Sequence, residues 1–283
     1  MNRNQPFGLL ATHLLLILFG VAMVYPLVWM FFASFKTTNE IFVSPRLLPE
    51  IFLWENYVNG WRSAATGAAS YTNFFINTFV LVIPTVAFTV LSSLLVAYGF
   101  GRFRFPGRKF LFSLMIATLM LPNAVIIIPR FMIFKNLGWL DSYLPFIVPA
   151  IFGCYPFFIF MLIQFLRGIP TALDESAKID GCGPVRILFG ILAPLMKPAL
   201  FSAGLFQFLW TWNDFFNQLI FINSPKKYTI ALGLRISIDS STEMVRWNEV
   251  MAMSICSILP LILLFFFAQR YFVEGISTSG LKG

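Results

Sequence analysis

A group of polar and aromatic side chains interrupts an apolar stretch in the second half of the chain. Aromatic rings next to hydrogen-bonding side chains are typical of sugar recognition, because a sugar ring has apolar CH faces and a rim of hydroxyl groups. The group therefore favours a pathway for a polar solute. Its members lie within residues 199–222: Gln207, Trp210, Asn213, Asp214 and Asn217.

The aspartate in this group limits where the group can lie. An ionised aspartate costs on the order of 2.5 to 3.5 kcal/mol at the centre of a membrane helix, so Asp214 should face the bundle interior, a partner subunit or water. At about 100° per residue, four of the five side chains and the neighbouring Gln218 fall near one face of a continuous helix. Two other interpretations stay open: these side chains join this helix to its neighbours, or they contact an external binding protein.

A second group of charged and small residues lies in the loop 167–198, between two long apolar runs. It reads Glu175-Ser-Ala-Lys-Ile-Asp-Gly181 and is followed by Ile191-Leu-Ala-Pro194. A membrane protein that builds a rigid exposed element in such a loop usually presents it to another protein. The segment predicts a docking site, and the alternative is an amphipathic connector that lies on the membrane surface.

The local sequence of this loop predicts two short helices joined at a corner. Thr171 can cap the first helix through its hydroxyl, with Asp174 and Glu175 favourable near the positive helix end. Gly181 can adopt the left-handed conformation that ends a helix, and Pro184 suits the first turn of a second one. We therefore expect helix, glycine corner and helix in this order.

Catalytic and metal-binding patterns are absent from the sequence. His13 is the single histidine and lies in the first apolar run, so no nucleophile with a plausible histidine base and no metal site can be picked out. Cys154 and Cys256 fall in apolar runs and Cys182 in a loop, so no disulfide is expected. No Gly-x-x-x-x-Gly-Lys-Ser/Thr phosphate loop occurs. The chain is predicted not to be an enzyme, and no cofactor is expected in it.

Composition places the chain among polytopic membrane proteins. Of 283 residues, 58% are hydrophobic and 11% charged, and the mean hydropathy is +0.80. Apolar runs of roughly 20 residues match the length that crosses a membrane as helix, whereas a β-barrel would show short alternating segments. We predict an all-α fold with six transmembrane helices in one permease domain, 1–283. The expected spans are 9–33, 74–99, 110–133, 143–166, 199–222 and 250–271.

The distribution of lysine and arginine predicts the orientation. Four positive charges and no acid lie in Gly101-Arg-Phe-Arg-Phe-Pro-Gly-Arg-Lys109, and the loop 167–198 is also basic. Such loops face the cytoplasm, and an even number of spans then places both termini there. The first run, 9–33, exceeds the apolar core of a signal peptide and is expected to be a retained span. The net charge of +8 thus reflects membrane topology, and no nucleic-acid partner is expected.

The loop motif resembles a family signature. Glu175 to Gly181 followed by Ile191 to Pro194 is similar to the Glu-Ala-Ala, Asp-Gly, Ile-x-x-Pro signature of inner-membrane permease subunits of binding-protein-dependent ABC importers. Ser176 replaces the usual first alanine, a change between two small residues. Four further segments resemble the maltose-transporter G-type branch of carbohydrate permeases: 97–108, 121–130, 137–145 and 275–283.

The resemblance implies a coupling role for the loop 167–198. In that family the helix pair lies in a cleft of a separate ATP-hydrolysing subunit, to which ATP and magnesium bind. The matching positions would make polar contacts, supply the corner and pack the two helices. They are Glu175, Ser176, Ala177, Asp180, Gly181, Ile191 and Pro194.

The resemblance also implies the substrate class, the partners and the location. It predicts an importer of a carbohydrate, with an oligosaccharide favoured, in the bacterial cytoplasmic membrane. The expected partners are a second permease chain, an ATPase dimer and an extracytoplasmic solute-binding protein. A permease for glycerol phosphate or another polar solute is the alternative, and an ion-coupled carrier or channel is a further one.

Overall fold

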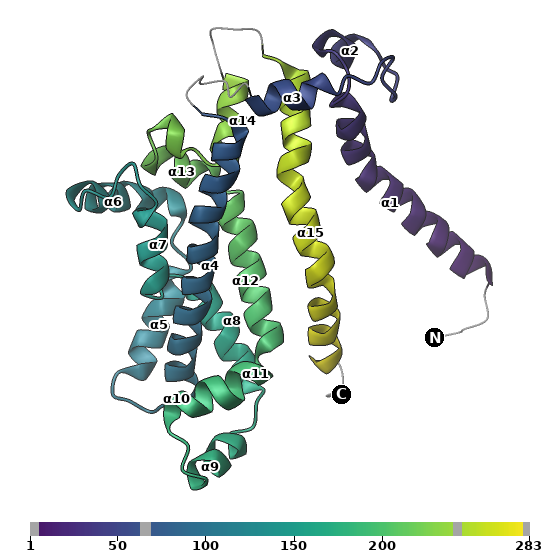
Figure 1. Cartoon of the computed structure of the whole chain (residues 1–283). Coiled ribbons are helices and arrows are strands. Elements are labelled where there is room, and N and C mark those ends of the chain that lie inside the picture. The colour runs from purple at the N-terminus through teal and green to yellow at the C-terminus, as the bar shows by residue number, and fades with distance from the viewer. Residues whose placement is uncertain (1–5, 63–68, 240–244, 280–283) are drawn as a thin grey trace. The chain divides into compact units, whose positions relative to one another are not determined.

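The computed structural model describes residues 6–62, 69–239 and 245–279, and every regular element in these ranges is helical (Figure 1). The predicted all-α fold is confirmed. The chain forms two compact units. The first comprises Met1–Tyr71 with Leu234–Leu259, and the second comprises Thr72–Gly233 with Pro260–Gly283.

The first unit is held together by a chain of amide side chains. Its elements are α1 (Pro6–Ala33), α2 (Thr38–Val43), α3 (Glu55–Arg62), the end of α14 (Ile230–Asp239) and the first part of α15 (Trp247–Ser279). The buried Asn56 donates through Nδ2 to the carbonyl oxygens of Ser34 and Lys36, both at 2.9 Å. Asn248 donates to Asn56 Oδ1 at 2.7 Å. These bonds connect the chain after α1 to α3 and α15.

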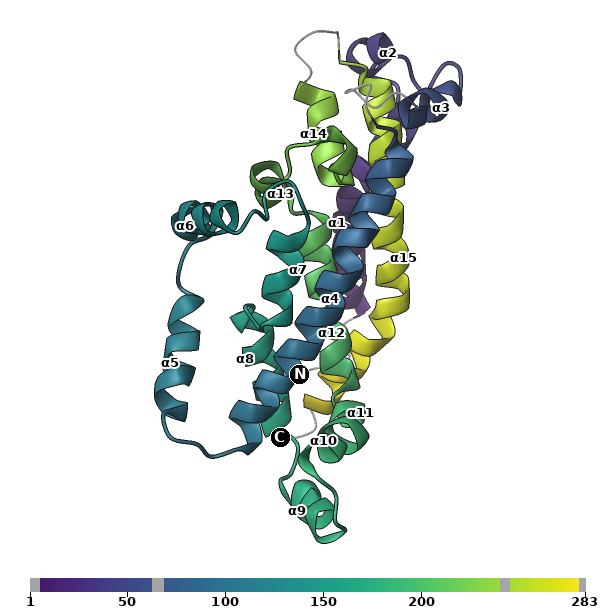
Figure 2. The same ribbon diagram turned by 60° about the vertical axis from the view of Figure 1, so that its left-hand side comes forward.

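The second unit carries both candidate sites. Its main helices pack lengthwise, and Figure 1 and Figure 2 both show α9 at one end of the unit and α13 toward the other. The unit includes α4 (Tyr71–Arg102) from Thr72, the start of α14 and α15 from Pro260. Its other helices are α5 (Arg108–Thr118), α6 (Asn123–Asn136), α7 (Leu144–Ile151), α8 (Pro156–Arg167), α9 (Ala172–Ile179), α10 (Pro184–Ile187), α11 (Ala193–Leu195), α12 (Lys197–Trp212) and α13 (Phe215–Phe221), with a π-helical turn at Leu188–Leu192 and a 3-10 turn at Pro225–Lys227.

Four helical segments of the described chain are long and apolar enough to cross a membrane. Two further pairs of helices meet this test only jointly, and each pair is sharply bent: Arg108–Thr118 with Asn123–Asn136 at 104°, and Pro184–Leu195 with Lys197–Trp212 at 80°. The total reaches six if each bent pair is one span. The four segments that meet the test singly are Leu9–Ala33, Tyr71–Arg102, Leu144–Arg167 and Trp247–Gln269.

Three of the predicted spans are not continuous helices, and in this respect the prediction was wrong. The expected span 143–166 is interrupted between the end of α7 at Ile151 and the start of α8 at Pro156. The expected span 110–133 divides into α5 and α6, because Pro122 disfavours helical backbone at the residue before it. The expected span 199–222 divides at Asn213 and Asp214, because Asp214 caps the start of α13 instead of continuing α12. Apolar length predicts that a segment is buried in lipid or protein, and it does not show where the helix is interrupted.

The main core of the second unit lies where α4 and α8 meet. Gly101 permits the close approach, because a Cβ atom at this position would lie 2.5 Å from Leu166 Cδ2. Both helices contribute buried leucines to this core, and so do the short helices of the loop 167–198, through Ala177 of α9 and Ile187 of α10. The loop is therefore built onto the helix bundle rather than attached to it by a flexible linker.

Candidate functional site

The predicted corner in the loop 167–198 has the geometry that the sequence indicates. Gly181 has a φ of +81°, in the left-handed region. Its amide bonds to the carbonyl of Lys178 at 3.0 Å, and the amide of Cys182 bonds to the carbonyl of Ala177 at 2.9 Å. These two bonds form a Schellman motif, which ends α9 in a defined way, and α10 begins at Pro184. α9, the left-handed Gly181 and α10 thus follow one another in the order that the sequence indicates.

The start of α9 differs from the prediction. The side chain of Thr171 makes no capping hydrogen bond, so the expected hydroxyl cap was wrong. Thr171 has helical backbone angles, φ −67° and ψ −20°, whereas an effective cap uses extended backbone to direct its oxygen at the helix amides. Its carbonyl oxygen instead accepts from the amides of Asp174 and Glu175, at 3.0 and 3.1 Å.

A buried ion pair joins α9 to the end of α4. Arg102 Nε lies 2.6 Å from Asp174 Oδ2, and the two side chains are only 10% and 8% exposed. Arg102 also donates through Nη2 to the carbonyl of Ile169 at 2.8 Å. One arginine thus binds both the helix and the turn that leads into it. In the sequence, Arg102 lies in a basic loop and Asp174 near a predicted helix end, and nothing there indicates that the two side chains pair.

The side of the helix pair that faces away from the core is apolar at its corner. Ile179 and Val185 flank Gly181 and are 87% and 71% exposed. These two side chains give the corner a small exposed apolar surface next to charged residues. Neither residue is among the coupling positions that the sequence predicted for this loop.

The other predicted coupling residues divide between this open surface and the core. Ala177 is buried, and Ile191 is half-buried in the π-helical turn. Ser176 donates to the carbonyl of Leu173 at 3.1 Å, so its hydroxyl is satisfied within α9. The exposed residues of the group are Glu175, Ser176, Asp180, Gly181 and Pro194.

Gln207 of the polar group and the neighbouring Gln218 both make hydrogen bonds within the protein. Gln207 is 2% exposed and donates through Nε2 to the Thr211 hydroxyl at 2.8 Å. Gln218 is fully buried, donates to the carbonyl of Thr211 at 3.0 Å and accepts from the Thr229 hydroxyl. These bonds connect α12, α13 and the chain before α14. They are the contacts that the packing interpretation expects of such side chains.

The rest of the polar group surrounds the break between α12 and α13. Asp214 Oδ1 accepts from the backbone amide of Asn217 at 3.1 Å and from its side-chain amide at 2.9 Å. The expected single face was therefore wrong, because the helix does not continue through Asp214. Asn213 is exposed, and its side chain donates to the carbonyl of Leu209 at 2.8 Å. Trp210 is half-exposed, with its ring centroid 5.0 Å from those of Phe157 and Phe158.

A third polar cluster, which the sequence analysis did not identify, surrounds Asp141. Its carboxylate accepts from the amides of Asn223 and Ser224 at 3.0 and 2.8 Å, from the Ser224 hydroxyl at 2.6 Å and from Lys227 Nζ at 2.9 Å. Burial alone raises the pKa of Asp141, but these hydrogen bonds outweigh it and hold the pKa of the carboxyl well below its ordinary value. The cluster joins the turn before α7 to the chain after α13.

The described residues contain no group of three or more histidine, cysteine, aspartate or glutamate side chains that could hold a metal ion. The fold and the sites define a multi-span helical membrane protein with a rigid, partly apolar helix pair at one end of its second unit.

Comparison with known proteins identifies the family. Residues 90–278 match the family described as binding-protein-dependent transport system inner membrane component, and the chain belongs to this family. It is 30% identical over 266 residues to the diacetylchitobiose uptake system permease protein NgcG of Streptomyces coelicolor, covering 94% of this chain and 86% of that protein. It is 34% identical over 280 residues to the sn-glycerol-3-phosphate transport system permease protein UgpE of Brucella abortus, covering 98% of each.

A solved structure has the same fold. A chain in the crystal structure of a bacterial ABC transporter involved in the import of the acidic polysaccharide alginate superposes with a TM-score of 0.84, at 21% identity, over 96% of this chain and 99% of that one. The family description makes this chain an inner-membrane component of a transport system, so it is a multi-pass membrane protein. The relatives named here are transport permease proteins, as the resemblance of the loop motif implied.

The buried ion pair gives the first prediction. Arg102→Gln should lower the free energy of unfolding by about 3–5 kcal/mol, because it leaves the Asp174 carboxylate buried without its partner. The double variant Arg102→Met with Asp174→Leu should recover most of this loss, because no charge is then left unpaired. The measurement is the thermal unfolding midpoint of the purified protein in detergent.

The matched control is Arg62→Gln, which removes an exposed arginine on α3 and should leave the midpoint unchanged. Equal midpoints for Arg102→Gln and Arg62→Gln would show that the ion pair does not hold α9 to α4.

The Asp141 cluster gives a prediction with a defined pH dependence. Asp141→Asn should lower the free energy of unfolding by about 2 kcal/mol at pH 7, because hydrogen bonds to a charged group are lost. Since the pKa of this carboxyl is lower in the folded than in the unfolded protein, its stabilisation is present above the unfolded pKa of about 3.9 and is lost as the pH falls below it. The difference in unfolding midpoint between wild type and variant should therefore be constant from pH 7 to about pH 5 and shrink below about pH 4.

Glu50→Gln serves as the control, because Glu50 is 65% exposed and faces Arg46 at 3.6 Å on the surface. Exposed ion pairs of this kind contribute little to the free energy of unfolding. A difference between wild type and Asp141→Asn that stays unchanged down to pH 3 would contradict the ionised role of Asp141.

Proposed function

We propose that the chain is the transmembrane subunit of an ATP-driven importer that moves a carbohydrate, with an oligosaccharide favoured, across the cytoplasmic membrane. It works with a second permease chain, an ATPase dimer and an extracytoplasmic solute-binding protein. Family membership supports the importer, since the family description names a binding protein on which transport depends. The substrate class is supported by the names of the relatives, which include a diacetylchitobiose permease.

The observation that carries the proposal is the rigid helix pair with an apolar corner. Ile179 and Val185 insert into a cleft of the ATPase, and the charged Glu175 and Asp180 make polar contacts at its edge. Exposing apolar side chains to water is unfavourable, and a partner surface that covers them removes this free-energy cost. ATP and magnesium bind to that partner and not to this chain. The helix pair and both termini lie on the cytoplasmic side.

The proposed mechanism depends on rigid attachment. Arg102 fixes α9 to α4, and Ala177 and Ile187 pack it against the core that α4 and α8 share. α10 continues through the π-helical turn and α11 into α12, after the 80° bend. When the two ATPase subunits close, they displace the helix pair. The helix pair then moves α4, α8 and α12 together, because packed elements move as rigid bodies. This motion alternates the transporter between its inward-facing and outward-facing states.

The solute pathway is proposed to pass the break between α12 and α13. Trp210 offers a half-exposed ring for a sugar face, and Asn213 offers an exposed amide for its hydroxyl groups. Gln207 and Asn217 shape this region, and Asp214 fixes the break by capping α13. Interrupted helices at membrane depth commonly line a cavity or a binding site, because their free backbone groups need polar partners.

A glycerol-phosphate importer is the second candidate, and the 34% identical relative named for that substrate favours it. Membership of a binding-protein-dependent family argues against the ion-coupled carrier or channel. Purifying the binding protein that belongs to this transporter and measuring its affinity for both substrate classes separates the two candidates.

The docking proposal is tested by placing a charge at the corner. Ile179→Asp should reduce recovery of the ATPase with the tagged chain at least tenfold. Removing a buried isoleucine from the interface and burying a carboxylate there each cost more than about 1.4 kcal/mol of binding free energy, which corresponds to a tenfold loss of affinity. The thermal unfolding midpoint should stay unchanged, because Ile179 is 87% exposed. The measurement is co-purification from membranes in mild detergent, quantified by mass spectrometry.

Val43→Asp is the matched control, since Val43 is also an exposed aliphatic residue, at 72%, on the short helix α2. It should leave ATPase recovery at the wild-type value. Full recovery with Ile179→Asp would contradict the assignment of this corner to the ATPase.

A further inference from the structure

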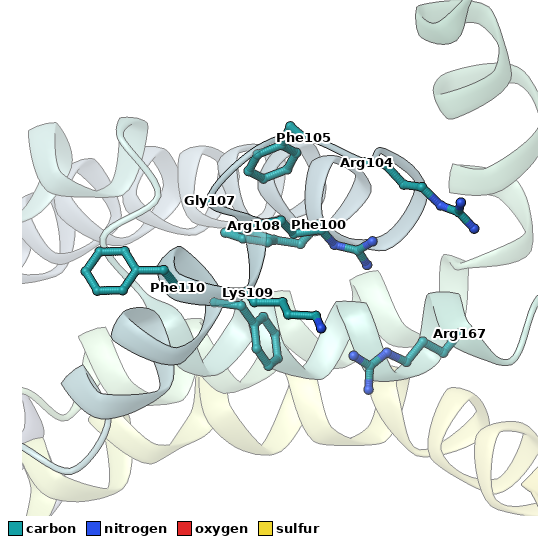
Figure 3. Close-up of a pocket in the computed structure, with 9 residues that line it drawn as sticks. Phe100, Arg104, Phe105, Gly107, Arg108, Lys109, Phe110 and Arg167 are labelled. Carbon is teal, nitrogen blue, oxygen red and sulfur yellow. The ribbon is translucent and has the colours of Figure 1, made fainter.

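A basic pocket of about 770 Å³ lies between the end of α4, the start of α5 and the end of α8. It belongs entirely to the second unit, and the docking proposal does not use it. Figure 3 shows the charged ends of four basic side chains toward one side of the pocket, with Phe110 on the opposite side. The basic side chains are Arg104, Arg108, Lys109 and Arg167.

The positive charge of this pocket has no counter-charge nearby. None of its lining residues is acidic, and in the part of the chain that the structure describes no ion pair to a carboxylate involves any of the four. Arg167 lies over the Phe112 ring, with its guanidinium carbon 5.9 Å from the ring centroid. Basic residues that flank membrane spans commonly point separately into water. Here they converge on a common cavity, which favours an anion as its occupant.

The apolar lining of the pocket continues along α5. No residue of this helix is buried. Phe110, Leu111 and Leu114 are 70%, 45% and 52% exposed, and they extend from the pocket along the helix. A ligand that satisfies both regions has an anionic end and a long apolar end.

We propose that this pocket binds the headgroup of an anionic phospholipid, with the acyl chains lying along the exposed side of α5. The location fits, because the pocket lies where one apolar helix ends and the next begins, which is the depth of lipid phosphates. Basic pockets between membrane helices on the cytoplasmic side bind anionic headgroups. The lipid holds the turn between α4 and α5 at the membrane surface.

The test measures lipid binding by native mass spectrometry of the purified full-length chain, with phosphatidylglycerol and phosphatidylcholine as probes. Wild type should retain phosphatidylglycerol in preference to phosphatidylcholine. The double variant Arg108→Gln with Lys109→Gln should bind phosphatidylglycerol about thirtyfold more weakly, since each basic side chain near an anionic surface contributes on the order of fivefold. The variant should fold normally, because cations at a helix start do not stabilise the helix.

The matched control removes two exposed lysines elsewhere, Lys135→Gln with Lys226→Gln, and should keep wild-type lipid affinity. An equal loss in the control would show a general charge effect and overturn the site. Displacement of the lipid by equimolar glycerol phosphate would show a site for free phosphate and overturn it as well. A double variant that keeps its phosphatidylglycerol, but from which the ATPase is lost when the tagged chain is co-purified from membranes, would assign the pocket to a protein partner instead.

Discussion

The buried pair of Arg102 and Asp174 is the constraint on which the second unit depends at its α9 end. Burying two charges is costly unless they satisfy each other, so this pair permits one arrangement of α9 relative to α4. The apolar contacts of Ala177 and Ile187 add packing to this arrangement. A short helix pair on a loop would otherwise move independently of the bundle. The combination of a specific ion pair with close packing makes the loop a rigid extension of the membrane helices.

The need of buried polar groups for partners also explains how the interruptions of the helices are stabilised. Backbone groups that lose their helical partners need others, since water is scarce inside a membrane protein. At the break between α12 and α13, Asp214 caps the new helix and Gln218 bonds to the carbonyl of Thr211. At the turn before α7, Asp141 accepts two backbone amides of the chain after α13. Polar side chains in apolar surroundings thus stabilise the irregular backbone at these interruptions.

The sequence predicted the features that depend on local chemistry. Apolar length indicated the helices, and the left-handed Gly181 and the helix start at Pro184 followed from conformational preferences that need no tertiary context. The side chain of Thr171 was predicted wrongly, because its role depends on a backbone conformation that the packing of the loop determines. The prediction of a continuous fifth span was wrong for a similar reason. An aspartate can accept hydrogen bonds either at the start of a helix or on the buried face of one, and the sequence does not show which of these Asp214 does.

Features that join distant parts of the chain could not be predicted. Arg102 and Asp174 lie in different loops of the sequence, and nothing in their neighbours indicates that they pair. The same is true of Asp141 and Lys227. The exposure of Ile179 and Val185 could not be inferred either, because an apolar residue in a short amphipathic helix is more often buried. Only the fold shows that Ala177 and Ile187 face the core and leave these two residues outside.

The central claim is that the corner formed by α9 and α10 contacts an ATP-hydrolysing subunit. Its most direct test is site-specific photo-crosslinking from a benzoylphenylalanine placed at position 179, with the whole transporter in its native membrane. The account predicts a covalent adduct between this chain and a protein that carries a Walker phosphate loop, and no such adduct when the probe is placed at position 43. An adduct with lipid alone, or with another membrane-spanning chain and not the ATPase, would contradict it.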